Sequence, residues 1–373
     1  MDAGLARTAP FATAPRVVVK IGSSLLVEGG AIRISWLASV VADIAARRAA
    51  GQQVVVVSSG AIALGARRLK LAKGGRGSLD DAQAAAAVGQ IALARSWAEL
   101  FAAHDIEAAQ ILLTLGDLED RRRYLNVAAT LDRLLALGAV PILNENDSVA
   151  TQEIRFGDND RLAARSAQAA GAGAVILLSD IDGLYTANPT QAGAKLIPTV
   201  DRIDDVAHMA DANSASGLGT GGMAAKIAAA RIAVQAGMPL AIVDGRAHNP
   251  LSAFAATGHG TVFTAEGGIA PRKAWLAGRL TVAGRLTIDA GAAAALRAGK
   301  SLLAAGVVAV EGDFVRGDAV EIAHGTTVIA RGLAAYDAPD ARAIAGARSD
   351  AQAIILGYAP RAAMVHRDQL VLV

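Results

Sequence analysis

Residues 16–24 read RVVVKIGSS, a short apolar run that ends in a lysine and continues into glycine and serine. Similar runs recur at Gln53–Val57, Gln110–Leu113, Val140–Leu143, Ala174–Leu178 and Pro239–Val243. They are apolar throughout and do not alternate with polar residues, which is typical of parallel strands covered by helices on both faces. We therefore expect each run to form one strand of a mostly parallel sheet.

Helical patterns occupy the intervals between these runs. The alanine-rich segments 81–103 and 223–236 favour helix. Another helix is predicted from about Arg122 to Leu137, with Gly138 just beyond its end, and Ser35 is the candidate N-cap of a further one. This alternation predicts an α/β fold, a three-layer αβα sandwich whose ligands bind at the carboxyl ends of the strands.

The chain changes character after about residue 277. Short β-type runs separated by turn residues follow at Arg285–Ile288, Gly306–Val310, Ala319–Ile322, Thr327–Ala330 and Val371–Val373. This pattern predicts a small β-rich barrel or sandwich. With a linker at about 265–278, we expect one domain at residues 1–270 and a second at residues 278–373.

Composition excludes several classes of function. The chain has 373 residues, no cysteine and a formal charge of only +2. A disulfide scaffold, a thiol nucleophile and a zinc finger are thereby excluded, and no strong field points to nucleic acid or an anionic membrane. No apolar stretch reaches the ~18 residues of a membrane helix, and no signal peptide is visible, so we expect a soluble cytoplasmic protein.

Polar and glycine residues follow several of the predicted strands directly. Lys20 leads into Gly22-Ser23-Ser24, the next strand leads into Ser58-Ser59-Gly60, and later strands lead into Asn144-Glu145-Asn146-Asp147 and Ser179-Asp180. The ends of parallel strands meet at one edge of a sheet, so these residues should converge. Each feature alone also fits an edge charge, a turn or a helix cap.

A glycine-rich run at residues 217–226 ends in Lys226 and adds a second lysine. Glycine-rich turns combined with two lysines are suited to binding a polyphosphate, because backbone amides and cations together stabilise its negative charge. Gly217, Gly219 and Gly222 match the G-x-G-x-x-G pattern, but the polar residues before them cannot form the buried strand of a nicotinamide site. A Walker A loop and a Gly-x-Ser-x-Gly elbow are absent, and the six histidines lack metal-ligand spacing.

Several motifs together resemble the glutamate 5-kinases of the amino-acid kinase family. They are VVKIGSSL (18–25), VSSGAIALG (57–65), NENDSVAT (144–151), GDND (157–160), DGLYTANP (182–189) and SGLGTGGMAAK (216–226). RGLAAY (331–336), ILGY (355–358) and VHRD (365–368) resemble the C-terminal PUA domain of that family. Single motifs would fit carbamate, acetylglutamate or aspartate kinases as well, whereas the long glycine loop and the added domain favour the glutamate 5-kinases.

The resemblance implies ATP-dependent phosphorylation of the L-glutamate side-chain carboxylate to L-glutamyl 5-phosphate, the first step of proline biosynthesis, with Mg²⁺ on the nucleotide phosphates. An acceptor carboxylate has an ordinary pKa of about 4.3, so it is ionised at neutral pH and needs no general base. Lysines and backbone amides must then offset the repulsion between two anions. The resemblance also implies feedback inhibition by L-proline and a homo-oligomer, either dimer or tetramer.

The same resemblance assigns roles to individual residues. Lys20 and Lys226 would contact the transferring phosphoryl group from two sides, and Asp160 would hold both lysines. The residues expected to bind glutamate are Ser59, Gly60, Asp147, Asp158 and Asn159. The residues expected to bind the nucleotide are Lys20, Ser179, Asp180, Thr220, Gly221, Gly222, Met223, Ala224, Ala225 and Lys226. Ser179 stands where the family often has threonine, and it keeps the hydroxyl; no metal ligand is assigned.

Two alternative functions stay open. The protein could be a kinase of the same family with another carboxylate acceptor, such as aspartate, or an RNA-binding or regulatory protein acting through its second domain. Residues 278–373 contain ten Lys/Arg and nine Asp/Glu, a net charge of +1 (10 − 9). That balance lacks the basic stripe of an RNA-binding face, so nucleic acid is not an expected partner.

Overall fold

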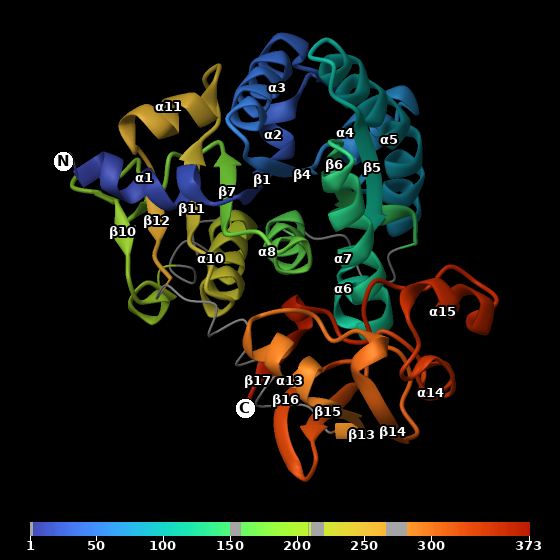
Figure 1. The fold of residues 1–373 in the computed structure, drawn as a ribbon. Helices are drawn as coiled ribbons and strands as arrows, with labels where there is room; N and C mark the ends of the chain where they lie inside the picture. The colour runs from blue at the N-terminus through green and yellow to red at the C-terminus, as the bar shows by residue number, and fades with distance from the viewer. Residues whose placement is uncertain (1–2, 150–157, 208, 210–219, 266–281) are drawn as a thin grey trace. The chain divides into compact units, whose positions relative to one another are not determined.

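The computed structural model describes residues 3–149, 158–207, 209, 220–265 and 282–373, and the chain divides into two units, Met1–Gly267 and Gly268–Val373 (Figure 1). The first unit contains an eight-stranded sheet in the order β10-β12-β11-β7-β1-β4-β6-β5. Its strands are β1 Arg16–Ile21, β4 Gln53–Ser58, β5 Ala108–Leu113, β6 Val140–Glu145, β7 Ala174–Ser179, β10 Thr199–Val200, β11 Leu240–Asp244 and β12 Thr261–Phe263.

The pairings of this sheet are parallel except that of β11 with β12, which is antiparallel. The predicted mostly parallel sheet is therefore confirmed, and each predicted strand lies within two residues of an observed one. The short strands β10 and β12 at one edge were not predicted, because two or three residues are too few to carry a pattern.

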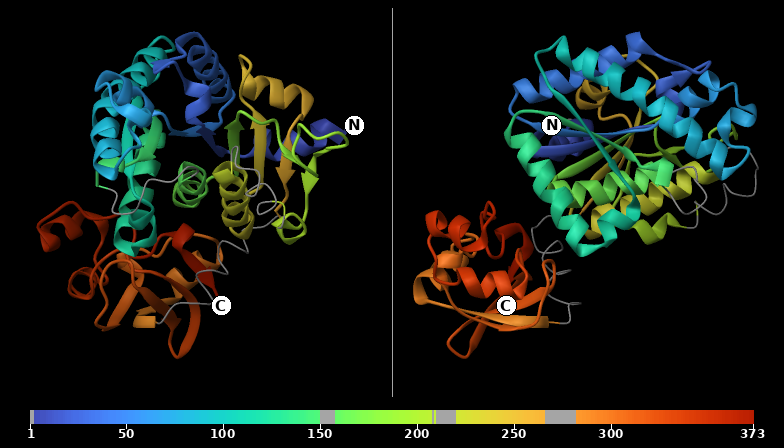
Figure 2. Two further views of the ribbon diagram at one scale, coloured as in Figure 1. Left: turned by 180° about the vertical axis from the view of Figure 1, so that it is seen from behind. Right: turned by 90° about the vertical axis from the view of Figure 1, so that its right-hand side faces the viewer.

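Helices cover both faces of the sheet (Figures 1 and 2). One face packs against α1 Ala3–Thr13, α3 Ile34–Ala49, α5 Leu79–Ala102 and α11 Pro250–Thr257, and the other against α7 Arg121–Ala136, α8 Asp158–Ala170 and α10 Thr220–Gln235. Successive residues of a strand point to opposite faces, so in β1 Val17 and Val19 join the first core and Val18 the second. The three-layer αβα sandwich is confirmed.

The predicted helix boundaries hold with one exception. Ser78 caps α5 by accepting a hydrogen bond from the Asp81 amide, and Gly138, with φ 83°, follows α7 as expected. The assignment of Ser35 as an N-cap is wrong, because α3 begins at Ile34 after Arg33. The Arg33 amide donates to the Leu26 carbonyl, and the Arg33 carbonyl accepts the first helical bond, so the chain enters the helix early.

Helix α5 lies unusually close to α4 Ala61–Arg68. A Cβ built on Gly89 of α5 would lie 1.8 Å from the Ala61 carbonyl oxygen, and one built on Gly65 of α4 would lie 1.8 Å from the Ala85 oxygen. The two backbones therefore touch at these glycines, where no side chain fits. This contact holds the start of α4, directly after Gly60, against the middle of α5.

We expect Gly89→Ala to lower the free energy of unfolding of the first unit by about 3 kcal/mol, because the helices must separate to admit the methyl group. Alanine otherwise favours helix over glycine, so the sign of the effect is diagnostic. Gly116→Ala in α6 Leu115–Glu119 is the matched control, since its nearest neighbour would be Thr114 Oγ1 at 3.6 Å. Chemical denaturation of both variants measures the difference, and equal stability would refute the close contact.

The second unit is built on a five-stranded mixed sheet in the order β14-β13-β15-β16-β17. Its elements are β13 Val282–Ile288, α13 Ala290–Arg297, β14 Val307–Gly312, β15 Ala319–His324, β16 Thr327–Leu333, α14 Ala338–Ile344, α15 Ser349–Leu356 and β17 Leu370–Leu372. The predicted β-rich second domain is confirmed, while the three α-helices that the structure describes in it were not expected. Among the described helices, none has the length and hydropathy needed to cross a membrane.

Candidate active site

The polar segments predicted at the strand ends do converge. Strand β1 lies between β4 and β7, and Ile21 pairs in register with both Ser58 and Leu178. On the far side of β7, Ser179 is level with Asp244 of β11. After β1 the chain forms β4 on one side of that strand, and later it forms β7 on the other side. Open α/β sheets bind ligands at such a switch point, where the strand order reverses, so this edge is the expected binding position.

A buried carboxylate joins the two lysines at this edge. Lys20 Nζ on β1 lies 2.5 Å from Asp160 Oδ1, and Lys226 Nζ on α10 lies 3.2 Å from Asp160 Oδ2. Asp160, near the start of α8, is 1% exposed, and the two lysines are 6% and 8% exposed. The structure therefore brings together three residues that lie far apart in the sequence.

The charges of this triad shift one another's pKa values. Burial alone raises the pKa of Asp160, but the ammonium groups of Lys20 and Lys226 outweigh it and hold the pKa below its ordinary value. Burial lowers the pKa of Lys20, and Lys226 lowers it further, while Asp160 opposes both. One carboxylate between two ammonium groups leaves a net positive site that can attract an anion.

The predicted glutamate residues lie on the β4 side of the triad. Ser59 follows β4 and is buried, and Gly60 adopts φ 107°, which favours glycine. Asn159 Nδ2 donates to Ser59 Oγ at 2.9 Å, and Asp147 is buried in a single 3₁₀ turn after β6. Asp158 is the first residue of α8, but its side chain lies outside the described residues.

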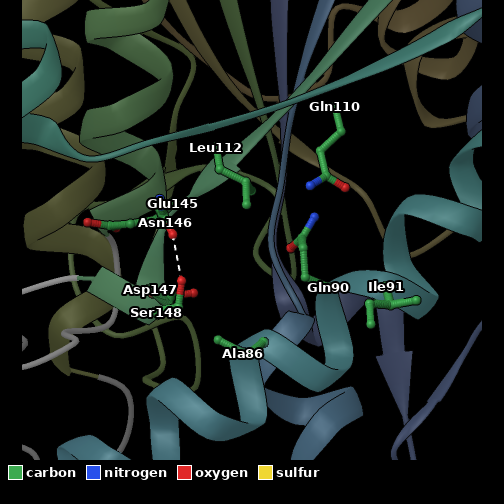
Figure 3. Close-up of a pocket in the computed structure, with 10 residues that line it drawn as sticks. Ala86, Gln90, Ile91, Gln110, Leu112, Glu145, Asn146, Asp147 and Ser148 are labelled. Carbon is green, nitrogen blue, oxygen red and sulfur yellow. Dashed lines mark hydrogen bonds between the residues drawn. The ribbon is translucent and has the colours of Figure 1, made fainter.

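A pocket of about 220 Å³ adjoins this cluster (Figure 3). Its walls come from α5, β5, the end of β6 and the segment after β6, and the polar residues among them are Gln90, Gln110, Glu145, Asn146, Asp147 and Ser148. Gln90 and Gln110 point toward one another across it (Figure 3). Asp147 therefore lines a cavity large enough for a small polar molecule.

The predicted nucleotide residues lie near β7 and α10. Ser179 is buried at the end of β7, and its hydroxyl donates to Asp180 Oδ1 at 3.2 Å. A Cβ on Gly222 would meet no atom of the described residues within 4 Å, so the backbone there is not covered by any of them. Met223, Ala224 and Ala225 lie half-buried in the same turn of α10; Thr220 and Gly221 also belong to this helix, but their surroundings lie outside the described residues.

Two polar residues were not assigned from the sequence. Both lie on the glutamate side of the triad, which is the region of Ser59, Asn159 and Asp147. Asn144 at the end of β6 accepts a hydrogen bond from Asn159 Nδ2 at 3.2 Å and donates to Gln90 Oε1 at 2.8 Å. Asn144 could have been singled out by its place in the NEND motif. Gln90 carries no such signal, because a glutamine in an alanine-rich helix resembles any solvated position.

Comparison with known families and proteins agrees with this geometry. Residues 15–244 match the amino acid kinase family, and residues 284–355 match the PUA domain. A glutamate 5-kinase of Sphingopyxis alaskensis is 65% identical over 97% of this chain and 99% of its own length. One of Novosphingobium aromaticivorans is 61% identical over 99% and 98%, and one of Zymomonas mobilis is 58% identical over 96% and 91%.

Among solved structures, a UMP kinase of Bacillus anthracis aligns with a TM-score of 0.47 at 15% identity, covering 68% of this chain and 97% of its own. The family match spans the αβα unit that carries the lysine–aspartate–lysine triad, and the relatives align over nearly the full length of both chains. The chain belongs to the amino acid kinase family and, within it, to the glutamate 5-kinases.

Proposed function

We propose that this protein transfers the γ-phosphoryl group of ATP to the side-chain carboxylate of L-glutamate, giving L-glutamyl 5-phosphate and ADP for proline biosynthesis. The observation that carries the proposal is the buried Lys20–Asp160–Lys226 triad at the switch point of the sheet. It lies between a hydroxyl- and amide-lined side, near Ser59 and Asn159, and a side where α10 presents backbone at Gly222.

The reaction needs positioning and charge neutralisation more than proton transfer. The glutamate carboxylate attacks as the anion, so no base must activate it. Lys20 and Lys226 face the region between acceptor and donor, where their charges offset the repulsion between two anions and stabilise the transferring group. Asp160 keeps both ammonium groups in place, and its charge opposes the loss of a proton from Lys20.

Mg²⁺ fits this site as an ion carried by the nucleotide. Among the residues that the structure describes, no three His, Cys, Asp or Glu side chains gather as a metal site, and Asp160 is already paired with two lysines. Mg²⁺ commonly binds through substrate phosphates with one or two carboxylates. Asp180, an exposed carboxylate whose charge acts on Lys20, is the side chain that we assign to help hold it. When bound, the ion neutralises charge on the phosphates.

Trapping the acyl phosphate with hydroxylamine tests the proposal. We expect glutamyl hydroxamate to form with ATP and L-glutamate, and little product with L-aspartate or N-acetylglutamate. Aspartyl hydroxamate in its place would support another acceptor within the same family, and absence of any hydroxamate would refute the proposed reaction.

Asp147→Ala should raise the KM for glutamate by about tenfold or more and leave the KM for ATP unchanged, because removal of a buried polar contact to substrate costs about 1.4 kcal/mol or more. Initial rates at varied glutamate and fixed ATP, and the reverse, measure both constants. Asp80→Ala, an exposed carboxylate on the first turn of α5, is the control. An unchanged glutamate dependence would contradict a role for Asp147 in binding.

We also infer feedback inhibition by L-proline, a close structural relative of glutamate, and assembly into dimers or tetramers, both as properties of the family. RNA binding finds no support in the second unit. Glu321 accepts from Arg285 at 3.1 Å and from Arg331 at 3.0 Å, so two guanidinium groups of its sheet are paired with a carboxylate. Inhibition assays with proline and size-exclusion with light scattering test the first two properties.

A further inference from the structure

A chain of hydrogen bonds crosses the wall of the glutamate side and joins four separate elements. It runs from Gln90 on α5 to Asn144 at the end of β6, then to Asn159 on α8, and ends at Ser59 after β4. Asn144 is only 2% exposed. The close contact of α4 with α5 at Gly65 and Gly89 brings Gln90 to this wall, because Gln90 directly follows Gly89.

The backbone decides which way each amide of this chain points. The Glu145 N–H can only donate, and it donates to Asn144 Oδ1 at 2.9 Å. The other terminal atom of Asn144 is therefore Nδ2, which needs an acceptor and finds Gln90 Oε1 at 2.8 Å. Because Asn144 Oδ1 is an acceptor, the Asn159 atom 3.2 Å from it must be the donor Nδ2.

This order leaves one acceptor and one donor of the wall without a hydrogen-bond partner among the described residues. Asn159 Nδ2 donates to both Asn144 and Ser59, so Asn159 Oδ1 points away from these two residues. This oxygen is buried and has no hydrogen-bond partner in the part of the chain that the structure describes. The Ser59 hydroxyl accepts from Asn159, so its own proton can be donated. The wall thus offers one acceptor and one donor.

An amino acid is complementary to that pair of groups. The carboxylates of glutamate have no proton to donate at neutral pH, so they can accept from Ser59 but cannot satisfy Asn159 Oδ1. The α-ammonium group is the donor that glutamate has. A buried acceptor left without a partner is unfavourable, so a dicarboxylate that lacks the ammonium group should bind poorly.

We propose that Gln90 is a positioning residue that makes the site specific for a free α-ammonium group. It holds Asn144, which orients Asn159 so that Oδ1 accepts from the ammonium of the substrate. This inference rests on the proposed glutamate kinase activity and adds the residue that sets how the amino group is recognised. Gln90 itself touches Asn144 and not the reacting atoms.

The test compares L-glutamate with glutarate, which has the same two carboxylates but no ammonium group. Initial rates of ADP release below KM give kcat/KM for each substrate in the wild type and in Gln90→Met, which keeps the length of the side chain and removes the acceptor. We expect Gln90→Met to lower kcat/KM for glutamate about tenfold, through KM, and to change that for glutarate less than about twofold.

Two further variants control for damage to the fold. Gln90→Glu keeps an acceptor for Asn144 Nδ2 and should stay within about threefold of the wild type. Gln235→Met changes an exposed glutamine at the end of α10, outside the pocket lining and the hydrogen-bond chain, and should leave kcat/KM for both substrates unaffected. Equal losses for glutamate and glutarate in Gln90→Met, or no loss for either, would overturn the role of Gln90. A wild type that does not phosphorylate glutamate would instead overturn the proposed function.

Discussion

Lys226→Ala is expected to lower turnover by about a thousandfold, the size of loss seen when a group that stabilises transition-state charge is removed. The ammonium group lies 3.2 Å from Asp160 and is nearly buried, so water cannot replace it easily. In this variant the Asp160 carboxylate faces only the Lys20 ammonium. The site therefore loses the excess positive charge that offsets the repulsion between glutamate and ATP.

The same variant should fold normally. Asp160 keeps Lys20 as its ion-pair partner at 2.5 Å, so no buried charge is left alone. Steady-state kinetics and thermal unfolding of the same preparation separate the two effects. Lys195→Ala, which removes an exposed lysine, is the matched control and should change neither. Turnover within tenfold of the wild type would contradict the assignment of Lys226.

Asp160→Asn should affect both stability and activity. It leaves two nearly buried ammonium groups without their carboxylate, and breaking a buried ion pair in this way costs about 3–5 kcal/mol. Turnover should also fall by about a hundredfold or more, because the lysines lose the group that positions them. Denaturant unfolding and initial rates measure these two losses.

The pH dependence of Asp160→Asn has a definite sign. In the proposed mechanism the protonated form of Lys20 is the active one, so activity should be lost as pH rises through its pKa, which burial lowers and Asp160 raises. Without the carboxylate that pKa falls further, and the alkaline limb of the kcat profile should move to lower pH. A limb in the same place as that of the wild type would show that Asp160 does not hold Lys20 charged.

The acid side of the stability profile offers a second readout. The pKa of Asp160 is lowered in the folded protein, so its contribution to stability is complete above the ordinary pKa of about 3.9 and is lost as pH falls through the lowered value. Asp160→Asn should lack this contribution at every pH.

Adding Lys226→Met to Asp160→Asn removes one unpaired ammonium, so the double variant should lose less stability than the two single losses added together.

The strands and the two-unit division could be predicted from the sequence because they depend on local composition. Apolar runs such as Arg16–Lys20 and Ala174–Leu178 became buried strands, since continuous burial leaves a pattern in the residues themselves. The start of α3 could not be placed in the same way. Its position depends on the bond from the Arg33 amide to the Leu26 carbonyl, which the sequence does not display.

For the site, the resemblance of the motifs to a known family supplied the candidate residues: Lys20, Lys226 and Asp160, together with Ser59 and Asn159. The resemblance also implied that Asp160 holds both lysines, but the physical reason for that arrangement lies in the folded chain, where the partners come from β1, α8 and α10 and meet through strand order. Gln90 is the clearest case of a residue whose role the sequence alone does not reveal. Its role depends on two glycines that let α5 touch α4, and on a backbone amide at Glu145 that orients Asn144. Such relations exist between distant segments, so they arise only when the chain is folded.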